Sequence, residues 1–305
     1  MVEYKFLGKT REKLSEIGIG TWQLGPNREQ NIESIHIALD NGVNFIDTAE
    51  IYGTEDTVGE AIRGRKNLFI ATKVWATHFR YDDVMKACNN SLTRLGLKQV
   101  DLYQLHWPNP SVDIKETMSA MEKLVSDGKI RYIGVSNFSK KQLIDAQNAM
   151  SKYDIVSNQV KYNILDRDPE KELLDYLHKQ KITLIAYSPL AHGNALKGRY
   201  SWLLEELGKI GKRYSKTSAQ VMLNWLIMKK GVIPIPKASS PKHMLEDVEA
   251  ADFKLSGPEI KYIDGLTSLS GNRYKRSAAL RKVVEVYLTL DSKFKRKSKT
   301  GKKPK

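Results

Sequence analysis

Four polar residues follow short apolar runs, at the places where predicted strands would give way to loops. They are Asp47, Tyr52, Lys73 and His106. Side chains of these types can transfer a proton together. A phenol can give or take the proton, an ammonium group lowers the pKa of the phenol, and a carboxylate holds the ammonium group. An imidazole can then orient a substrate oxygen, so this chemistry requires a fold that brings all four together.

The runs before these residues have the composition of buried strands. Asp47 and Tyr52 follow residues 43–46, Lys73 follows 68–72, and His106 follows 100–105. In a parallel barrel the C-terminal ends of the strands meet at one face, and catalytic residues come from several of those ends. A barrel of this kind would place the four side chains side by side.

Apolar strand-like runs alternate with helical patterns along most of the chain. The predicted strands cover residues 16–22, 44–47, 68–73, 100–106, 132–136, 155–159, 183–187 and 232–236. The predicted helices cover residues 30–41, 54–63, 81–95, 114–127, 140–150, 169–179, 218–229 and 241–250, with a further helix near 202–213 in an insertion. Eight alternating pairs predict an α/β protein with a (β/α)8 TIM barrel. A doubly wound sheet is the competing fold, but the chain lacks its Gly-x-Gly-x-x-Gly turn.

Length and composition limit the class of protein. The chain has 305 residues, of which 41% are hydrophobic, which suits one large barrel or two ordinary domains. Residues 1–10 are charged, so we expect no signal peptide, and no run reaches the roughly 18 apolar residues of a membrane span. The single cysteine, Cys88, cannot form an internal disulfide. We therefore expect a cytoplasmic protein.

The formal net charge of +15 is concentrated at the C-terminus. Residues 273–305 carry eleven of these excess charges, so we expect a barrel domain over 1–272 and a basic extension over 273–305. An apolar stripe within 279–288 predicts a helix that packs on the barrel or forms a subunit interface. The last part, 293–305, predicts a solvated tail, with contact to nucleic acid or anionic lipid as the alternative.

Several motifs resemble those of the aldo-keto reductase superfamily. They are NFIDTAEIYG at 44–53, ATK at 71–73, LHWP at 105–108, IGVSNF at 133–138, NQVKYN at 158–163, AYSPL at 186–190 and IPK at 235–237. The resemblance covers about residues 4–269, with the motifs in the family's order. It implies a barrel that binds NADP(H) without a Rossmann fold and a hairpin over residues 4–18 that caps the barrel bottom. An extra C-terminal helical segment would follow the barrel.

The resemblance also implies roles for the residues that match the family's motifs. The catalytic residues would be Asp47, Tyr52, Lys73 and His106, with Tyr52 as the general acid and base. The nicotinamide and pyrophosphate contacts would be Ser136, Asn137, Gln159, Tyr187, Ser188 and Leu190, within a loop over 188–197. The contacts to the other end of the coenzyme would be Lys237, Ser239, His243, Glu246 and Asp247.

The coenzyme end departs from the family's pattern at two positions. Ala238 replaces a serine, and His243 replaces an arginine. Lys237 still offers a positive charge to a 2′-phosphate, but the planar, bidentate guanidinium is lost. We therefore expect NADPH/NADP+ as the coenzyme, with NADH as a weaker second one and less discrimination than the family usually shows.

Three tryptophans are predicted to line the substrate pocket. They are Trp22, Trp75 and Trp107, and core packing is the alternative for each. The sequence leaves open whether aldehydes, ketones or sugars bind, and it predicts no metal. We expect reduction of small carbonyl compounds to alcohols by a monomer or weak dimer. A cofactor-binding regulatory subunit, like the channel-associated members of the superfamily, is the alternative function.

Overall fold

The computed structural model describes residues 1–191 and 198–267. The chain divides after Lys254 into two compact units, and α10 (Gly257–Leu266) belongs to the second. The helix and tail predicted within 273–305, and the part of the predicted pyrophosphate loop at 192–197, lie outside the described residues. In the part of the chain that is described, no helix has both the length and the apolar character needed to cross a membrane.

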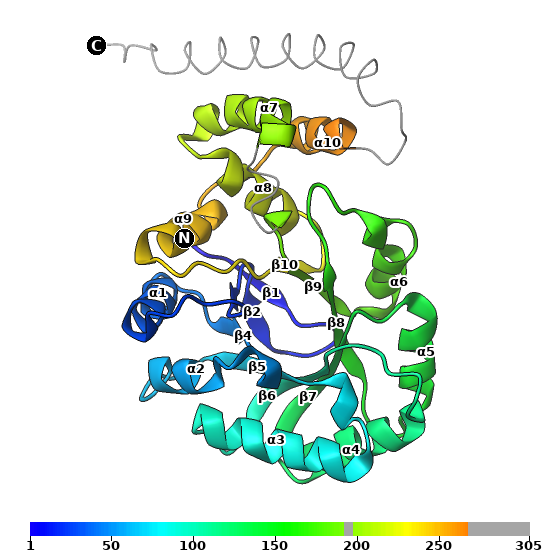
Figure 1. The fold of residues 1–305 in the computed structure, drawn as a ribbon. Coiled ribbons are helices and arrows are strands. Elements are labelled where there is room, and N and C mark those ends of the chain that lie inside the picture. Colours follow the sequence, from blue (N-terminus) through cyan, green and yellow to red (C-terminus); the bar gives the residue numbers. More distant parts are fainter. Residues whose placement is uncertain (192–197, 268–305) are drawn as a thin grey trace, which may run out of the picture. The chain divides into compact units, whose positions relative to one another are not determined.

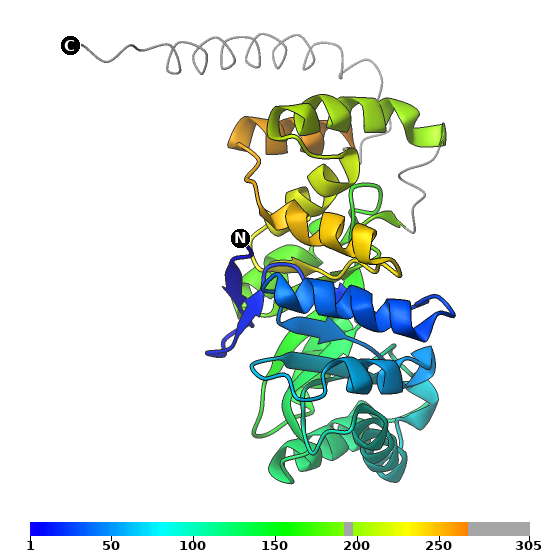
Figure 2. The same cartoon turned by 90° about the vertical axis from the view of Figure 1, so that its left-hand side faces the viewer.

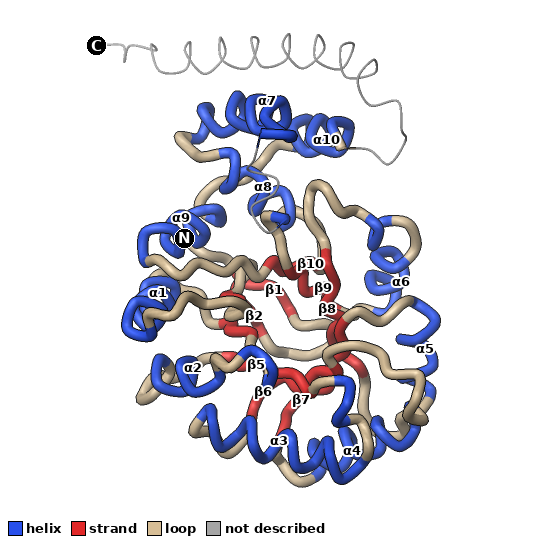
Figure 3. Tube along the Cα trace, viewed as in Figure 1, coloured by secondary structure: helices blue, strands red, loops and turns tan. Residues whose placement is uncertain are grey.

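Parallel strands form the inner ring of the first unit (Figures 1 and 3). In sheet order they are β3 (Ile19–Gly20), β4 (Phe45–Asp47), β5 (Phe69–Val74), β6 (Val100–Leu105), β7 (Ile130–Ser136), β8 (Ile155–Lys161), β9 (Thr183–Tyr187) and β10 (Val232–Pro234). Each strand pairs with the next one in the chain. This order confirms the predicted eight-stranded barrel.

The first and last strands close the ring through backbone hydrogen bonds. The amide of Gly18 donates to the carbonyl of Pro234 at 2.9 Å, and the amide of Gly20 donates to that of Pro236 at 2.8 Å. A Cβ atom on Gly20 would lie only 2.8 Å from the carbonyl oxygen of Ile235. Glycine is therefore needed where the two ends of the sheet meet.

A hairpin of β1 (Tyr4–Phe6) and β2 (Lys13–Ser15) covers the N-terminal end of the barrel, as predicted (Figure 2). Leu7 and Leu14 are fully buried and pack into a cluster with barrel residues such as Phe45. The ammonium group of Lys5 donates to the carbonyls of Ile227 and Val232. The hairpin therefore closes this end with both apolar and polar contacts.

The helices of the first unit lie outside the strands (Figure 3). They are α1 (Arg28–Asp40), α2 (Glu55–Ala61), α3 (Tyr81–Leu95), α4 (Ile114–Ser126), α5 (Lys140–Asn148), α6 (Leu173–Gln180), α7 (Ser201–Gly211), α8 (Ser218–Ile227) and α9 (Pro241–Val248). Side-chain caps begin several of them: Asp113 caps α4, and Ser139 and Thr217 form capping boxes on α5 and α8. Helix α6 begins four residues later than predicted, because Asp168–Glu170 forms a separate 3₁₀ turn.

Cys88 lies on the buried, apolar face of α3. Val84, Cys88, Leu92 and Leu95 are all buried along this face. Burial raises the pKa of the Cys88 thiol to about 12. The residue is therefore a neutral core side chain at physiological pH.

Candidate active site

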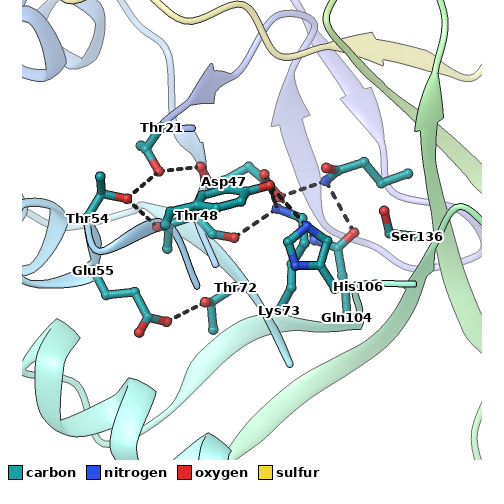
Figure 4. A network of polar contacts seen from close by, with 12 residues as sticks. Thr21, Asp47, Thr48, Thr54, Glu55, Thr72, Lys73, Gln104, His106 and Ser136 are labelled. Atoms are coloured by element: carbon teal, nitrogen blue, oxygen red, sulfur yellow. Dashed lines mark hydrogen bonds and ion pairs between the residues drawn. The ribbon is translucent and has the colours of Figure 1, made fainter. Parts of the chain in front are cut away.

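The four residues predicted to carry chemistry meet at the C-terminal end of the barrel. Asp47 ends β4, Lys73 lies near the end of β5, and His106 directly follows β6. Tyr52 ends a 3₁₀ turn, Glu50–Tyr52, in the loop after β4. The structure thus brings all four together, as the strand-end positions predicted. Figure 4 shows Asp47, Lys73 and His106 side by side.

Lys73 is the centre of the cluster. Its ammonium group donates to Asp47 Oδ1, to the carbonyl of Thr48 at 2.9 Å, and to the Tyr52 hydroxyl at 3.4 Å. The side chain is fully buried, and burial alone would lower the pKa of the ammonium group. The charge and hydrogen bond of Asp47 outweigh that effect and raise the pKa of Lys73. The buried ammonium group therefore stays charged mainly because the carboxylate is beside it.

Two opposing effects set the pKa of Tyr52. Burial of the ring raises the pKa of the phenol above its usual value of 10.0, whereas the positive charge of Lys73 lowers it. The sequence predicted only the second effect, and burial is the larger one. The phenol is therefore protonated at neutral pH and can act as a proton donor.

His106 faces the Tyr52 hydroxyl with Nε2 at 3.3 Å. Burial, together with the positive charge of Lys73, lowers the pKa of His106 to about 3, so the imidazole is neutral at pH 7. Its carbonyl accepts a hydrogen bond from Asn137 Nδ2 at 3.1 Å, and the Trp75 ring meets its edge at a centroid distance of 5.2 Å. The ring can therefore orient an oxygen without bringing a second positive charge into the site.

The low pKa of His106 predicts a specific loss of stability in acid. An unfolded histidine has a pKa near 6.5, so between about pH 6.5 and pH 3 the unfolded state binds a proton that the folded state does not. Folding stability is thus unaffected by His106 above about pH 6.5 and falls as the pH decreases through this window. We expect a loss of about 3 to 5 kcal/mol in the free energy of unfolding by pH 3.

The test is urea unfolding of the wild type and of His106→Gln between pH 4 and pH 7. As the pH falls, the free energy of unfolding of the wild type should decrease more than that of His106→Gln. Glutamine in place of the exposed His243 serves as the matched control variant. A constant difference between wild type and His106→Gln across this range would contradict the expectation.

The residues predicted to bind nicotinamide form a second polar group beside the first. Ser136 ends β7, and Asn137 follows it in the left-handed region at a φ of 62°. The Tyr187 hydroxyl donates to Asn137 Oδ1 at 2.9 Å, and Asn137 Nδ2 donates to Ser136 Oγ at 3.0 Å. Ser188 also has a positive φ, and its carbonyl accepts a hydrogen bond from Asn163 Nδ2. Leu190 is half-buried.

Gln159 has a partner that the sequence did not predict. Its Nε2 donates to Asp47 Oδ2 at 2.7 Å, and Gln104 Nε2 donates to the same oxygen at 3.0 Å. Both amide side chains are almost completely buried. Gln104 could have been noticed from the sequence, because it is an uncharged polar residue in an otherwise apolar part of the β6 run.

A cavity of about 360 Å³ opens over this group. Its walls include all three predicted tryptophans, Trp22, Trp75 and Trp107, and Asp47, Tyr52, His106, Ser136, Asn137, Gln159, Tyr187 and Ser188 also line it. Ile51 is a lining residue that the sequence did not predict, although it directly precedes Tyr52. Trp22 and Trp107 are 42% and 44% exposed, which favours a ligand-binding wall over core packing.

The residues predicted for the other end of the coenzyme lie in the segment before α9 and along that helix. None of Lys237, Ser239, His243, Glu246 and Asp247 lines the cavity. Lys237 Nζ donates to Ser239 Oγ at 3.1 Å, and the side chain of His243 is exposed. Burial, reinforced by Glu246, raises the pKa of Asp247 to about 7 against the opposing charge of Lys237. A ligand that reaches both groups must therefore be extended.

Closed parallel barrels with polar groups at the C-terminal strand ends are typical of enzymes, and this one has the groups that proton transfer requires. A model of the Aldo/keto reductase family matches residues 16–268. The glyoxal reductase of Bacillus subtilis (strain 168) is 38% identical over 253 residues, which cover 82% of this chain and 87% of that protein. The methylglyoxal reductase YeaE of Escherichia coli (strain K12) is 34% identical over 260 residues, which cover 82% and 90%.

Solved structures agree with this match. An aldo-keto reductase from Klebsiella pneumoniae in complex with NADPH has a TM-score of 0.82 and 33% sequence identity, and the match covers 90% of this chain and 98% of that chain. The chain therefore belongs to the aldo/keto reductase family and is an oxidoreductase. This confirms the resemblance that the sequence motifs indicated.

Proposed function

We propose that this protein reduces small aldehydes and ketones with NADPH, and that Tyr52 is the proton donor. The observation that carries the proposal is the contact of the Tyr52 hydroxyl with both Lys73 and His106 at the cavity wall. A protonated phenol in this place can give its proton to a carbonyl oxygen. In the reverse direction the same oxygen would take the proton of an alcohol.

The cavity fits a nicotinamide ring in its chemistry. Ser136, Asn137 and Gln159 offer donors and acceptors for a carboxamide, and Tyr187 offers an aromatic face beside them. NADPH supplies the hydride when it is bound. The family relation and the NADPH-bound structure of a relative support this coenzyme.

The remaining residues prepare the carbonyl for reduction. The neutral His106 would donate from Nε2 to the substrate oxygen and hold it next to the Tyr52 hydroxyl. Lys73 would stabilise the phenolate that remains after the proton has left, and Asp47 would hold Lys73 in place. The tryptophan walls would exclude water from the reacting carbonyl.

For the substrate class we propose α-oxoaldehydes such as methylglyoxal and glyoxal. Two relatives with these activities in their names cover 82% of the chain, and the cavity is small and mainly apolar. The test is NADPH oxidation with methylglyoxal, glyoxal, benzaldehyde and xylose. A higher kcat/KM for the two dicarbonyls supports the proposal, and a preference for xylose or the aromatic aldehyde overturns the substrate class. No turnover with any carbonyl would favour the regulatory alternative.

The His243 position leads to a prediction about coenzyme choice. We expect the wild type to prefer NADPH over NADH, and His243→Arg to raise the ratio of their kcat/KM values about tenfold, because an arginine can bind a 2′-phosphate with two hydrogen bonds. Lys237→Met should lower the ratio. A wild-type ratio at or below one, or a ratio that His243→Arg leaves unchanged, would contradict this placement of the phosphate.

A further inference from the structure

Gln104 is a buried amide behind the catalytic group that the mechanism above does not use. It lies on β6 in register with Lys73 on β5 and with Gly134 on β7. Neighbours in register point to the same face of a sheet, so Gln104 and Lys73 both point into the barrel. Figure 4 shows Gln104 within the network that links Lys73 and Asp47.

Gly134 leaves the space that the Gln104 side chain occupies. A Cβ atom on Gly134 would lie 2.9 Å from Gln104 Cγ and 2.5 Å from Ser157 Oγ. Any larger residue at 134 would therefore displace Gln104. The close approach shows that the Gln104 side chain is tightly packed in one position.

The contacts of Asp47 show what this amide does. Lys73 occupies Oδ1, whereas Gln104 and Gln159 both donate to Oδ2, at 3.0 and 2.7 Å. Gln159 Nε2 also approaches Gln104 Oε1 at 3.4 Å. The proposed function asks Gln159 to bind the coenzyme amide as well. If Gln159 turned to the coenzyme, Gln104 would be the one amide left on Oδ2 among the described residues.

We propose that Gln104 is a positioning residue that keeps the Asp47 carboxylate fixed on Lys73 when Gln159 turns to the coenzyme. This inference rests on the proposed function. A buried carboxylate needs hydrogen bonds in addition to its ion pair, and a missing one leaves it free to shift. A shift of Asp47 would move Lys73 relative to the Tyr52 hydroxyl and so change proton transfer.

The first test is Gln104→Met, which keeps the length of the side chain but removes both amide groups. We expect kcat to fall about tenfold, because the Asp47 carboxylate loses a hydrogen bond that a charged group needs in a buried site. The Kd of NADPH, measured by fluorescence, should change less than twofold. The matched control is Ser157→Ala, a fully buried polar residue that bonds to none of the catalytic residues within the described chain and should keep the wild-type kcat.

A pH profile separates positioning from simple packing. The Tyr52 phenol is faced by Lys73, Asp47, His106 and Tyr187. Removing the amide donor takes away a dipole that offsets the charge of Asp47, so the pH at which alcohol oxidation begins to rise should move upward in Gln104→Met. A variant with an unchanged pH profile and kcat, or an equal loss in Ser157→Ala, overturns the proposal.

Gln104→Glu provides a second variant of the same size in case Gln104→Met fails to fold. Its carboxylate would repel Asp47 at pH 8 and could donate only when protonated, so its rate relative to wild type should rise as the pH falls to 5.5. Wild-type activity of Gln104→Glu at pH 8 would contradict the role. A different result would contradict the proposed function itself: the wild-type protein would reduce no carbonyl compound.

Discussion

Replacing Tyr52 with phenylalanine is expected to lower kcat by about 100- to 10,000-fold, the range that a general acid contributes. Phenylalanine keeps the ring and its packing against His106 but removes the hydroxyl that contacts Lys73 and His106. The Kd of NADPH should stay within about threefold of wild type, because the residues proposed to bind the coenzyme are unchanged. Steady-state reduction of methylglyoxal and fluorescence titration with NADPH measure the two quantities.

The control for this change is Tyr103→Phe. Tyr103 is fully buried on β6, and its hydroxyl has no hydrogen-bond partner in the part of the chain that the structure describes. Because successive strand residues point to opposite faces, it points away from the side that carries Gln104. We expect normal turnover from Tyr103→Phe. A Tyr52→Phe protein with more than a tenth of the wild-type kcat would rule out Tyr52 as the essential proton donor.

Replacing Lys73 with methionine is expected to impair both folding and chemistry. Loss of the cation leaves the Asp47 carboxylate buried without its ion partner, which costs about 3 to 5 kcal/mol in the free energy of unfolding. The phenolate of Tyr52 loses its stabilising charge at the same time, and we expect kcat to fall at least about 100-fold. Urea unfolding and steady-state kinetics measure these effects separately.

A double variant distinguishes the two losses. Asp47→Asn in the Lys73→Met background removes the uncompensated charge, so part of the stability should return while kcat stays low. Lys5→Met is the matched control, since Lys5 is a half-buried lysine at the opposite end of the barrel that bonds to backbone carbonyls. It should lower stability without lowering kcat. Recovery of activity in the double variant would show that Lys73 acts through folding alone.

The parts of this site that the sequence predicts are those that follow from strand positions. Asp47, Lys73 and His106 occur at the ends of apolar runs, and the ends of parallel strands must converge in a barrel. Helix α3 was predicted to its ends, because its apolar period is regular and Gly96 stops it with a positive φ. The residues expected to contact the coenzyme came from the resemblance of the motifs to the family.

The rest depends on packing that a sequence does not specify. The bond from Gln159 to Asp47 joins strands that are far apart in the chain, and its geometry depends on how the barrel closes. The direction of the Tyr52 pKa shift depends on which effect is larger, the increase caused by burial or the decrease caused by the Lys73 charge. The size of the first effect follows from how much of the ring is exposed, which the sequence does not give. The start of α6 depends on contacts between residues before the helix. Tyr162 and Arg167 both donate to the Glu170 carboxylate, and Glu170 lies in the 3₁₀ turn that precedes α6.

The burial of Cys88 has a consequence for the durability of this protein. α-Oxoaldehydes are electrophiles, and the thiolate form of cysteine is the nucleophile that they would attack. A thiol with a pKa of about 12 on the inner face of α3 has almost no thiolate at pH 7, and the side chain has no exposed surface. The chain thus keeps its one cysteine away from the class of compound that it is proposed to consume, and inactivation by substrate would have to occur elsewhere.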